Sequence, residues 1–143
     1  MMYLKNFVFA YICTIGFAIL FNVPKSSLTK SGFAGAFGWI IFILINNTFN
    51  SVVVSTFIAS FIIALIGEFF AIIGKQPITV YIIPGIVPLV PGFGLYYTML
   101  SILEEDYELA ISYGSESLLI AMAIAGSLTI VLSLNSFRKR KKI

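Results

Sequence analysis

The sequence predicts an all-α, polytopic membrane protein with about five transmembrane helices, the fourth of which is broken. Hydrophobic residues make up 59% of the 143 residues, and charged residues make up only 10%, whereas soluble domains carry roughly 25% charged residues. The mean hydropathy is +1.03, and long apolar runs alternate with short polar connections. The chain has no histidine, which excludes histidine-based catalysis, metal ligation and proton relay.

A single integral membrane domain is expected over residues 1–143, because no soluble segment separates the apolar runs. The first helix is expected at about residues 3–21, a length that just spans a bilayer. Pro24 follows it, and the absence of a small-residue cleavage site favours an uncleaved helix over a signal peptide. A shorter second helix is expected at about residues 32–46, where a glycine-rich start suits close helix packing.

The third helix is expected at about residues 52–74, and one of its sides carries small or polar residues that suit helix contact. The members of this side are Thr56, Ser60, Ala64, Gly67, Glu68 and Ala71, whereas Ile58, Ile62, Leu65, Phe69 and Ile73 fall on the opposite, lipid-suited side. An isolated charge in hydrocarbon costs on the order of 3 kcal/mol, so Glu68 must face the bundle or water. Glu68 either carries a proton in a transport cycle, or it reaches the interface or pairs with Lys75.

The fourth segment, residues 78–103, contains three prolines and three glycines near residues 84–94. Each proline removes an N–H donor, so we do not expect a continuous helix here. Broken backbone at membrane depth must be lined by protein or water. The break is therefore either a hinge or the exposed N-terminus of a half-helix, which can bind a carboxylate. The second reading gives the candidate substrate-binding residues, which are Pro91, Gly92, Gly94, Tyr96, Tyr97 and Thr98.

The last helix is expected at about residues 117–137, between an acidic stretch and a basic tail. Five of the nine basic residues lie in the tail, at residues 138–142. A basic tail directly after an apolar helix indicates a cytoplasmic anchor rather than nucleic-acid binding. Lys25, Lys30 and Lys75 then also fall inside, which gives five crossings with the N-terminus outside. A four-crossing alternative with a re-entrant fourth segment stays open. A second small-residue face recurs every four residues, at Ser117, Ala121, Ala125, Thr129 and Ser133.

The sequence carries no motif that indicates an enzyme. Phosphate-loop, zinc-protease and serine-nucleophile signatures are all missing. The crowded acids at residues 104–108 are interpreted as a solvated loop, since no partner base accompanies them. Cys13 is the only cysteine, so it forms no disulfide within the chain and has no metal-ligand spacing around it. We therefore expect neither catalysis, nor a cofactor, nor a metal site.

Three stretches resemble the small, C-terminal-type membrane domain of the threonine/serine exporter family. They are GFAILFNVPKSSL at residues 16–28, PGIVPLVPGFGLYYTML at 84–100 and SESLLIAMAIAG at 115–126, and the proline-glycine motif is the most specific. The resemblance implies a subunit of a secondary transporter in the inner membrane that exports threonine and serine, driven by proton motive force. It also implies a larger membrane subunit as partner. Export of a dicarboxylate and a purely structural subunit remain alternatives, and association with further copies of the chain stays open.

Overall fold

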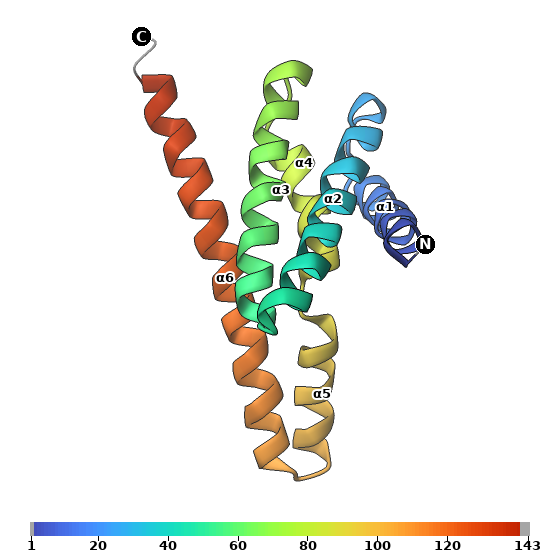
Figure 1. Ribbon diagram of the computed structural model, residues 1–143, viewed down its shortest axis with the longest axis vertical. Helices are drawn as coiled ribbons and strands as arrows, with labels where there is room; N and C mark the ends of the chain where they lie inside the picture. Colours follow the sequence, from blue (N-terminus) through green and yellow to red (C-terminus); the bar gives the residue numbers. More distant parts are fainter. Residues whose placement is uncertain (1, 141–143) are drawn as a thin grey trace.

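The computed structural model describes the backbone of residues 2–140 and the side chains of residues 2–134. Its regular structure is helical throughout that part of the chain (Figure 1). The elements are α1 (Met2–Leu20), α2 (Lys25–Phe49), α3 (Val52–Gly74), α4 (Thr79–Ile86), the 3₁₀ turn η1 (Val87–Leu89), α5 (Gly92–Leu103) and α6 (Tyr107–Arg140). Four helices are long and apolar enough to cross a membrane, and the broken pair would add a fifth. The predicted all-α, polytopic fold class is confirmed.

α2 begins at Lys25 and not near residue 32 as predicted, because Pro24 starts the helix instead of only ending the previous one. Pro24 is the N-cap residue, with φ −53° and ψ 137°, and the helix needs no N–H from a residue at this position. The N–H of Ser27 donates to the Pro24 carbonyl oxygen at 2.8 Å. α2 also runs to Phe49, past the predicted end at residue 46, and stops at Asn50 with a φ of 48°.

α6 begins at Tyr107 and not near residue 117, so residues 107–116, which were expected to connect the last two helices, are helical. The Asp106 carboxylate accepts a hydrogen bond from the N–H of Leu109 at 3.1 Å. Glu108 lies in the first turn, where a negative charge is favoured by the helix dipole. Only residues 104–106 form the connection between α5 and α6.

The predicted break in the fourth segment is confirmed, and it is narrower than expected. Pro84 lies inside α4, and the irregular part comprises η1, Val90 and Pro91. Val90 is extended, with φ −64° and ψ 132°. The two parts of the broken helix meet at an angle of 52°. The prolines at 88 and 91 thus determine the break, because each lacks the N–H that a continuing helix would use.

Small residues on α2 allow three helices to approach it closely. A Cβ added at Gly35 would overlap the Thr14 side chain of α1, and one added at Gly38 would overlap Ile63 of α3. A Cβ at Gly85 of α4 would lie 3.7 Å from the backbone nitrogen of Gly35. α2 therefore packs closely on three helices, as the glycine-rich start of this segment predicted.

The contact face predicted for α3 is confirmed in its main part, whereas the one predicted for α6 differs. Thr56, Ser60, Ala64 and Gly67 of α3 are buried, and the Ser60 and Ser127 hydroxyls join α3 to α6 at 2.6 Å. On α6 only Ser117 of the predicted stripe is buried. Its other members, Ala121, Ala125, Thr129 and Ser133, are exposed, and Ile120, Ile124, Ser127 and Val131 are buried instead.

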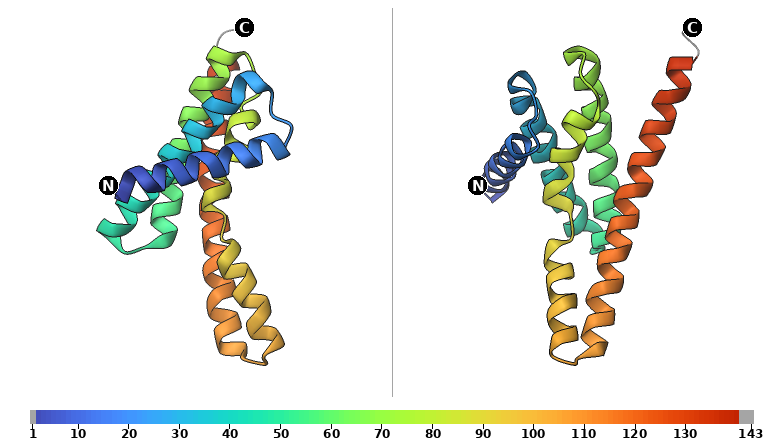
Figure 2. Two further views of the ribbon diagram at one scale, coloured as in Figure 1. Left: turned by 90° about the vertical axis from the view of Figure 1, so that its right-hand side faces the viewer. Right: turned by 180° about the vertical axis from the view of Figure 1, so that it is seen from behind.

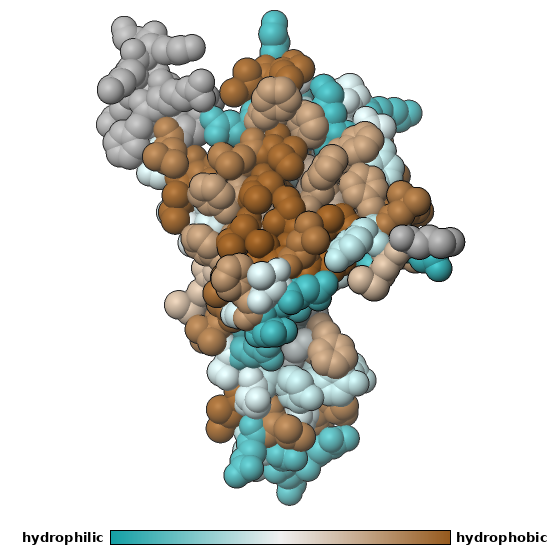
Figure 3. Space-filling model, viewed as in Figure 1, coloured by the Kyte–Doolittle hydropathy of each residue, from teal (hydrophilic) through white to brown (hydrophobic). Residues whose placement is uncertain are grey.

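α5 and the first half of α6 form a hairpin that extends beyond the connection between α2 and α3 (Figures 1 and 2). α5 packs extensively on α6 alone, whereas α4 packs on α2 and α3. The space-filling view shows a broad apolar area over the main bundle and hydrophilic residues at the hairpin tip (Figure 3). The side chains of the basic tail lie outside the described residues.

Candidate functional site at the broken helix

The N-terminus of α5 carries backbone donors that the helix does not use. Pro91 is the N-cap residue and offers no side-chain hydrogen bond. The N–H of Gly92 donates to Val90 at 2.8 Å, and the N–H of Leu95 donates to the N-cap carbonyl oxygen at 3.1 Å. The N–H groups between them, at residues 93–94, have no acceptor four residues back within the helix. Together with the helix dipole, such groups favour a bound anion.

Two of the predicted site residues, Gly94 and Thr98, face α6. A Cβ at Gly94 would overlap the Ser117 hydroxyl of α6. The Thr98 hydroxyl donates to the Gly94 carbonyl oxygen at 2.7 Å, and its methyl group would lie 3.3 Å from a Cβ at Gly114. These two residues therefore bring α5 and α6 close together, and the Thr98 hydroxyl is already bonded to the backbone.

The aromatic residues of α5 form a cluster beside its N-terminus. The ring of Tyr97 lies 4.3 Å from that of Phe93 and 5.5 Å from that of Tyr113, measured between centroids. Tyr96 meets Tyr97 edge to face at 5.3 Å and is 63% exposed. Gly92 is also exposed. The donors of α5 thus open onto the outer surface of the chain and not into an enclosed cavity.

Glu68 lies apart from these residues. It is half-buried on α3, and the neighbouring Gly67 packs against Tyr81 and Ile82 in the middle of α4. α5 begins beyond the end of α4 and continues away from it (Figure 1). The structure therefore gathers the predicted substrate residues around the break and α5, whereas the predicted proton carrier follows a glycine that packs beside the middle of α4.

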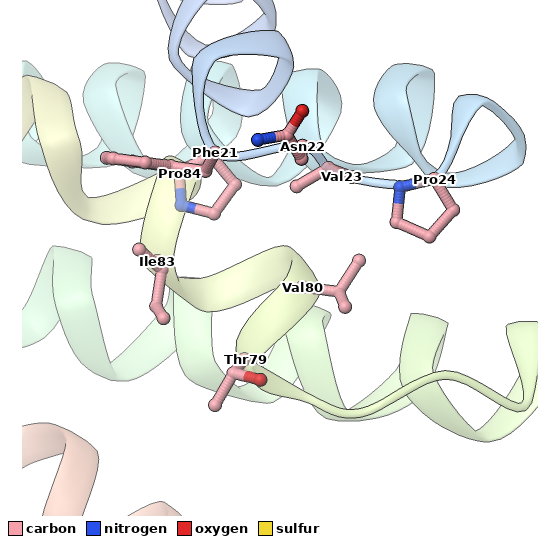
Figure 4. Close-up of a pocket in the computed structure, with 8 residues that line it drawn as sticks. All are labelled: Phe21, Asn22, Val23, Pro24, Thr79, Val80, Ile83 and Pro84. Carbon is pink, nitrogen blue, oxygen red and sulfur yellow. The ribbon is translucent and has the colours of Figure 1, made fainter.

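A pocket of about 290 Å³ lies beside the broken helix, between α4 and the connection from α1 to α2. Figure 4 shows the connection on one side and the short helix on the other. Its lining residues are Phe21, Asn22, Val23, Pro24, Thr79, Val80, Ile83 and Pro84. Sequence reasoning did not single out this pocket. Part of its lining could have been found from the sequence, since residues 21–24 and Pro84 belong to two of the stretches that resemble the exporter family.

Hydroxyl groups fix α4 against α2 on the side facing the bundle. Tyr81 is fully buried, and its hydroxyl lies 3.0 Å from the Ser27 hydroxyl. The Ser31 hydroxyl donates to the carbonyl oxygens of Val80 at 3.1 Å and of Ser27 at 3.0 Å. A Cβ at Gly74 would overlap the Tyr81 hydroxyl. The sequence analysis missed this cluster, which sets the position of one wall of the pocket.

Among the side chains of residues 2–134, no group of three or more Cys, Asp or Glu is placed to hold a metal ion. The polar groups near the break are backbone N–H groups, tyrosine and threonine hydroxyls and one asparagine amide. This set can bind and orient a small zwitterion or anion through hydrogen bonds. It offers no nucleophile paired with a base.

Apolar helices long enough to cross a bilayer, one of them broken by prolines, define a polytopic α-helical membrane protein. A family model described as Threonine/Serine exporter, ThrE, matches residues 6–134, and the chain belongs to this family. An uncharacterized protein of Haemophilus influenzae is 28% identical over 101 residues, which make up 71% of this chain and 34% of that relative. The chain thus spans about a third of the length of this curated relative. No solved structure matches it.

Proposed function

We propose that this chain is one membrane domain of a secondary transporter that exports threonine and serine. The observation that carries the proposal is the family match over residues 6–134. The broken helix adds a physical reason, since discontinuous helices place free backbone groups where a polar solute can bind. The apolar helices around the break keep those groups at membrane depth or at its edge.

The substrate carboxylate is assigned to the N-terminus of α5, at the free N–H groups of residues 93–94. Gly92 leaves this end of the helix open, because a Cβ there would meet nothing within 4 Å. Pro91 holds the preceding backbone, and the hydroxyls of Tyr96 and Tyr97 are near enough in sequence to contact the amino or hydroxyl group of the substrate. Gly94 and Thr98 support the site by holding α5 on α6.

Proton coupling is assigned to Glu68, acting at a distance from the substrate. Glu68 follows Gly67, and a Cβ at Gly67 would lie 3.0 Å from Ile82 of α4. A change in the charge of Glu68 would alter the packing of α3 against α4, which leads directly into the break. The short helix α4 is thus the element that would connect proton binding to the substrate site.

A second membrane domain is needed to enclose the substrate, because the donors of α5 face outward. The matched region is only 34% of the Haemophilus influenzae relative, which supports a larger assembly. The partner is assigned as the larger subunit of the same transporter. We place the assembly in the inner membrane, with the basic end of the chain in the cytoplasm.

The test compares two glycines that both have open space, Gly92 at the site and Gly16 on α1. Gly92→Ala should raise the KM for threonine export by about tenfold, since a methyl group at the carboxylate position costs about 1.4 kcal/mol of binding. Gly16→Ala is the matched control and should leave export unchanged. Export of labelled threonine is measured from cells with and without the chain. Succinate is added as a competitor, because it distinguishes threonine export from the alternative of dicarboxylate export. Export that does not depend on the chain would refute the transport assignment.

A further inference from the structure

α5 turns its small residues inward and its large apolar residues outward. Gly94, Thr98 and Ser101 lie on the side that packs on α6. The opposite side carries four exposed residues at spacings of three or four, which we call the α5 stripe. They are Phe93 (68% exposed), Tyr96 (63%), Met99 (64%) and Leu103 (79%). In a helix this spacing places side chains on one continuous face.

The α5 stripe lies beyond the part of the bundle that fills a bilayer. α2 has 25 residues and α3 has 23, so each is roughly 35 Å long at 1.5 Å per residue. That length already matches the ~30 Å hydrocarbon core. α5 starts near the level of the α2–α3 connection and runs away from it (Figures 1 and 2). If α2 and α3 span the bilayer, the stripe lies outside the lipid tails, where an exposed apolar patch marks a site of protein interaction.

The charges beside the stripe indicate which protein covers it. Glu104, Glu105 and Asp106 follow Leu103 directly and are exposed, and Glu108 lies on the next turn. A second copy that paired its hairpin symmetrically with this one would place these carboxylates opposite each other, which costs binding energy. A surface with an apolar centre and lysine or arginine at its edge would match both the apolar stripe and the acidic residues beside it.

We propose that the α5 stripe is the docking surface for the remaining membrane domain of the transporter. That domain meets the stripe with an apolar helix face and the acidic tip with basic residues. The inference rests on the proposed function, because the occupant is the rest of the same assembly. The Haemophilus influenzae relative, of which the matched part is 34%, has enough additional chain for such a domain. Docking there would also cover Gly92 and close the open N-terminus of α5.

The test places a photo-crosslinking amino acid at Met99 or Leu103 of the full chain in its native membrane. Matched controls carry it at Phe69 or Ile72, which are exposed on α3. We expect both stripe positions to yield an adduct with one and the same membrane protein, identified by peptide mass spectrometry, and the controls to yield none. The double variant Glu104→Lys, Glu105→Lys should reduce this adduct about tenfold, by like-charge repulsion.

Two other outcomes would overturn the docking proposal. Adducts between two differently tagged copies would assign the stripe to self-association, and adducts with lipid alone would show that it faces the bilayer. Threonine export from the same cells separates this inference from the proposed function. Intact export without a protein adduct contradicts the docking surface alone. A specific adduct in cells whose threonine export is independent of the chain contradicts the transport assignment and leaves the docking surface standing.

Discussion

At the residue scale, a few hydroxyl groups decide how apolar helices fit together. Ser27 and Tyr81 are far apart in the sequence, yet their side chains meet at 3.0 Å in a fully buried site. A tyrosine in an apolar run looks the same in sequence whether its hydroxyl is bonded in the core or exposed, as the exposed Tyr96 shows. Only the packing of α4 on α2 shows that Tyr81 is the buried, hydrogen-bonded tyrosine of the two.

We expect Tyr81→Phe and Ser27→Ala to destabilise the protein each by about 1 kcal/mol, because each removes the same buried hydrogen bond. Each single change leaves the other hydroxyl buried without its partner. Thermal unfolding of the single and double variants in detergent measures the coupling between the two positions. Strictly additive losses would show that the two hydroxyls do not interact.

At the scale of elements, the break was predictable and the helix ends were less so. Prolines 88 and 91 interrupt the helix in any environment, because each removes a backbone donor. The starts of α2 and α6 were misplaced by reading charged and polar residues as loops. Asp106 is a favourable N-cap residue, and Pro24 can precede a helix because no N–H is needed at that position. The predicted helix ends followed the polar composition of these stretches instead.

Asp106→Ala should fray the start of α6, because the N–H of Leu109 loses its acceptor. The expected loss is about 1 kcal/mol, as for other N-cap residues. Hydrogen–deuterium exchange of residues 107–112 should become faster in this variant. Glu104→Ala, which removes a neighbouring charge outside the helix, is the control and should leave that exchange unchanged. Equal protection in both variants would rule out capping by Asp106.

At the scale of the whole molecule, charge is separated along the long axis. Lys25 at the start of α2 and Lys75 after α3 lie at the end where α6 finishes, whereas residues 104–106 form the tip at the opposite end (Figure 2). This separation agrees with the orientation proposed from the lysines, in which the acidic tip faces outward.

Cysteine accessibility tests that orientation. In a Cys13→Ala background, Glu104→Cys should react with a membrane-impermeant maleimide in intact cells. Lys25→Cys should react only after the cells are permeabilised, because the basic end lies in the cytoplasm. Labelling of both positions from the same side would favour the four-crossing arrangement with a re-entrant fourth segment.

The sequence by itself determined the membrane class, the all-helical fold, the position of the break and the family. These depend on local chemistry, namely apolar runs long enough to span a membrane, prolines that lack a backbone N–H, and glycines that lack a side chain. The tertiary structure decided which residues come together, because that depends on how distant helices pack. It placed the part of α3 that carries Glu68 beside the middle of α4 and away from α5, bonded Tyr81 to Ser27, and turned the large side chains of α5 outward. No local pattern of the sequence shows which neighbours a helix has.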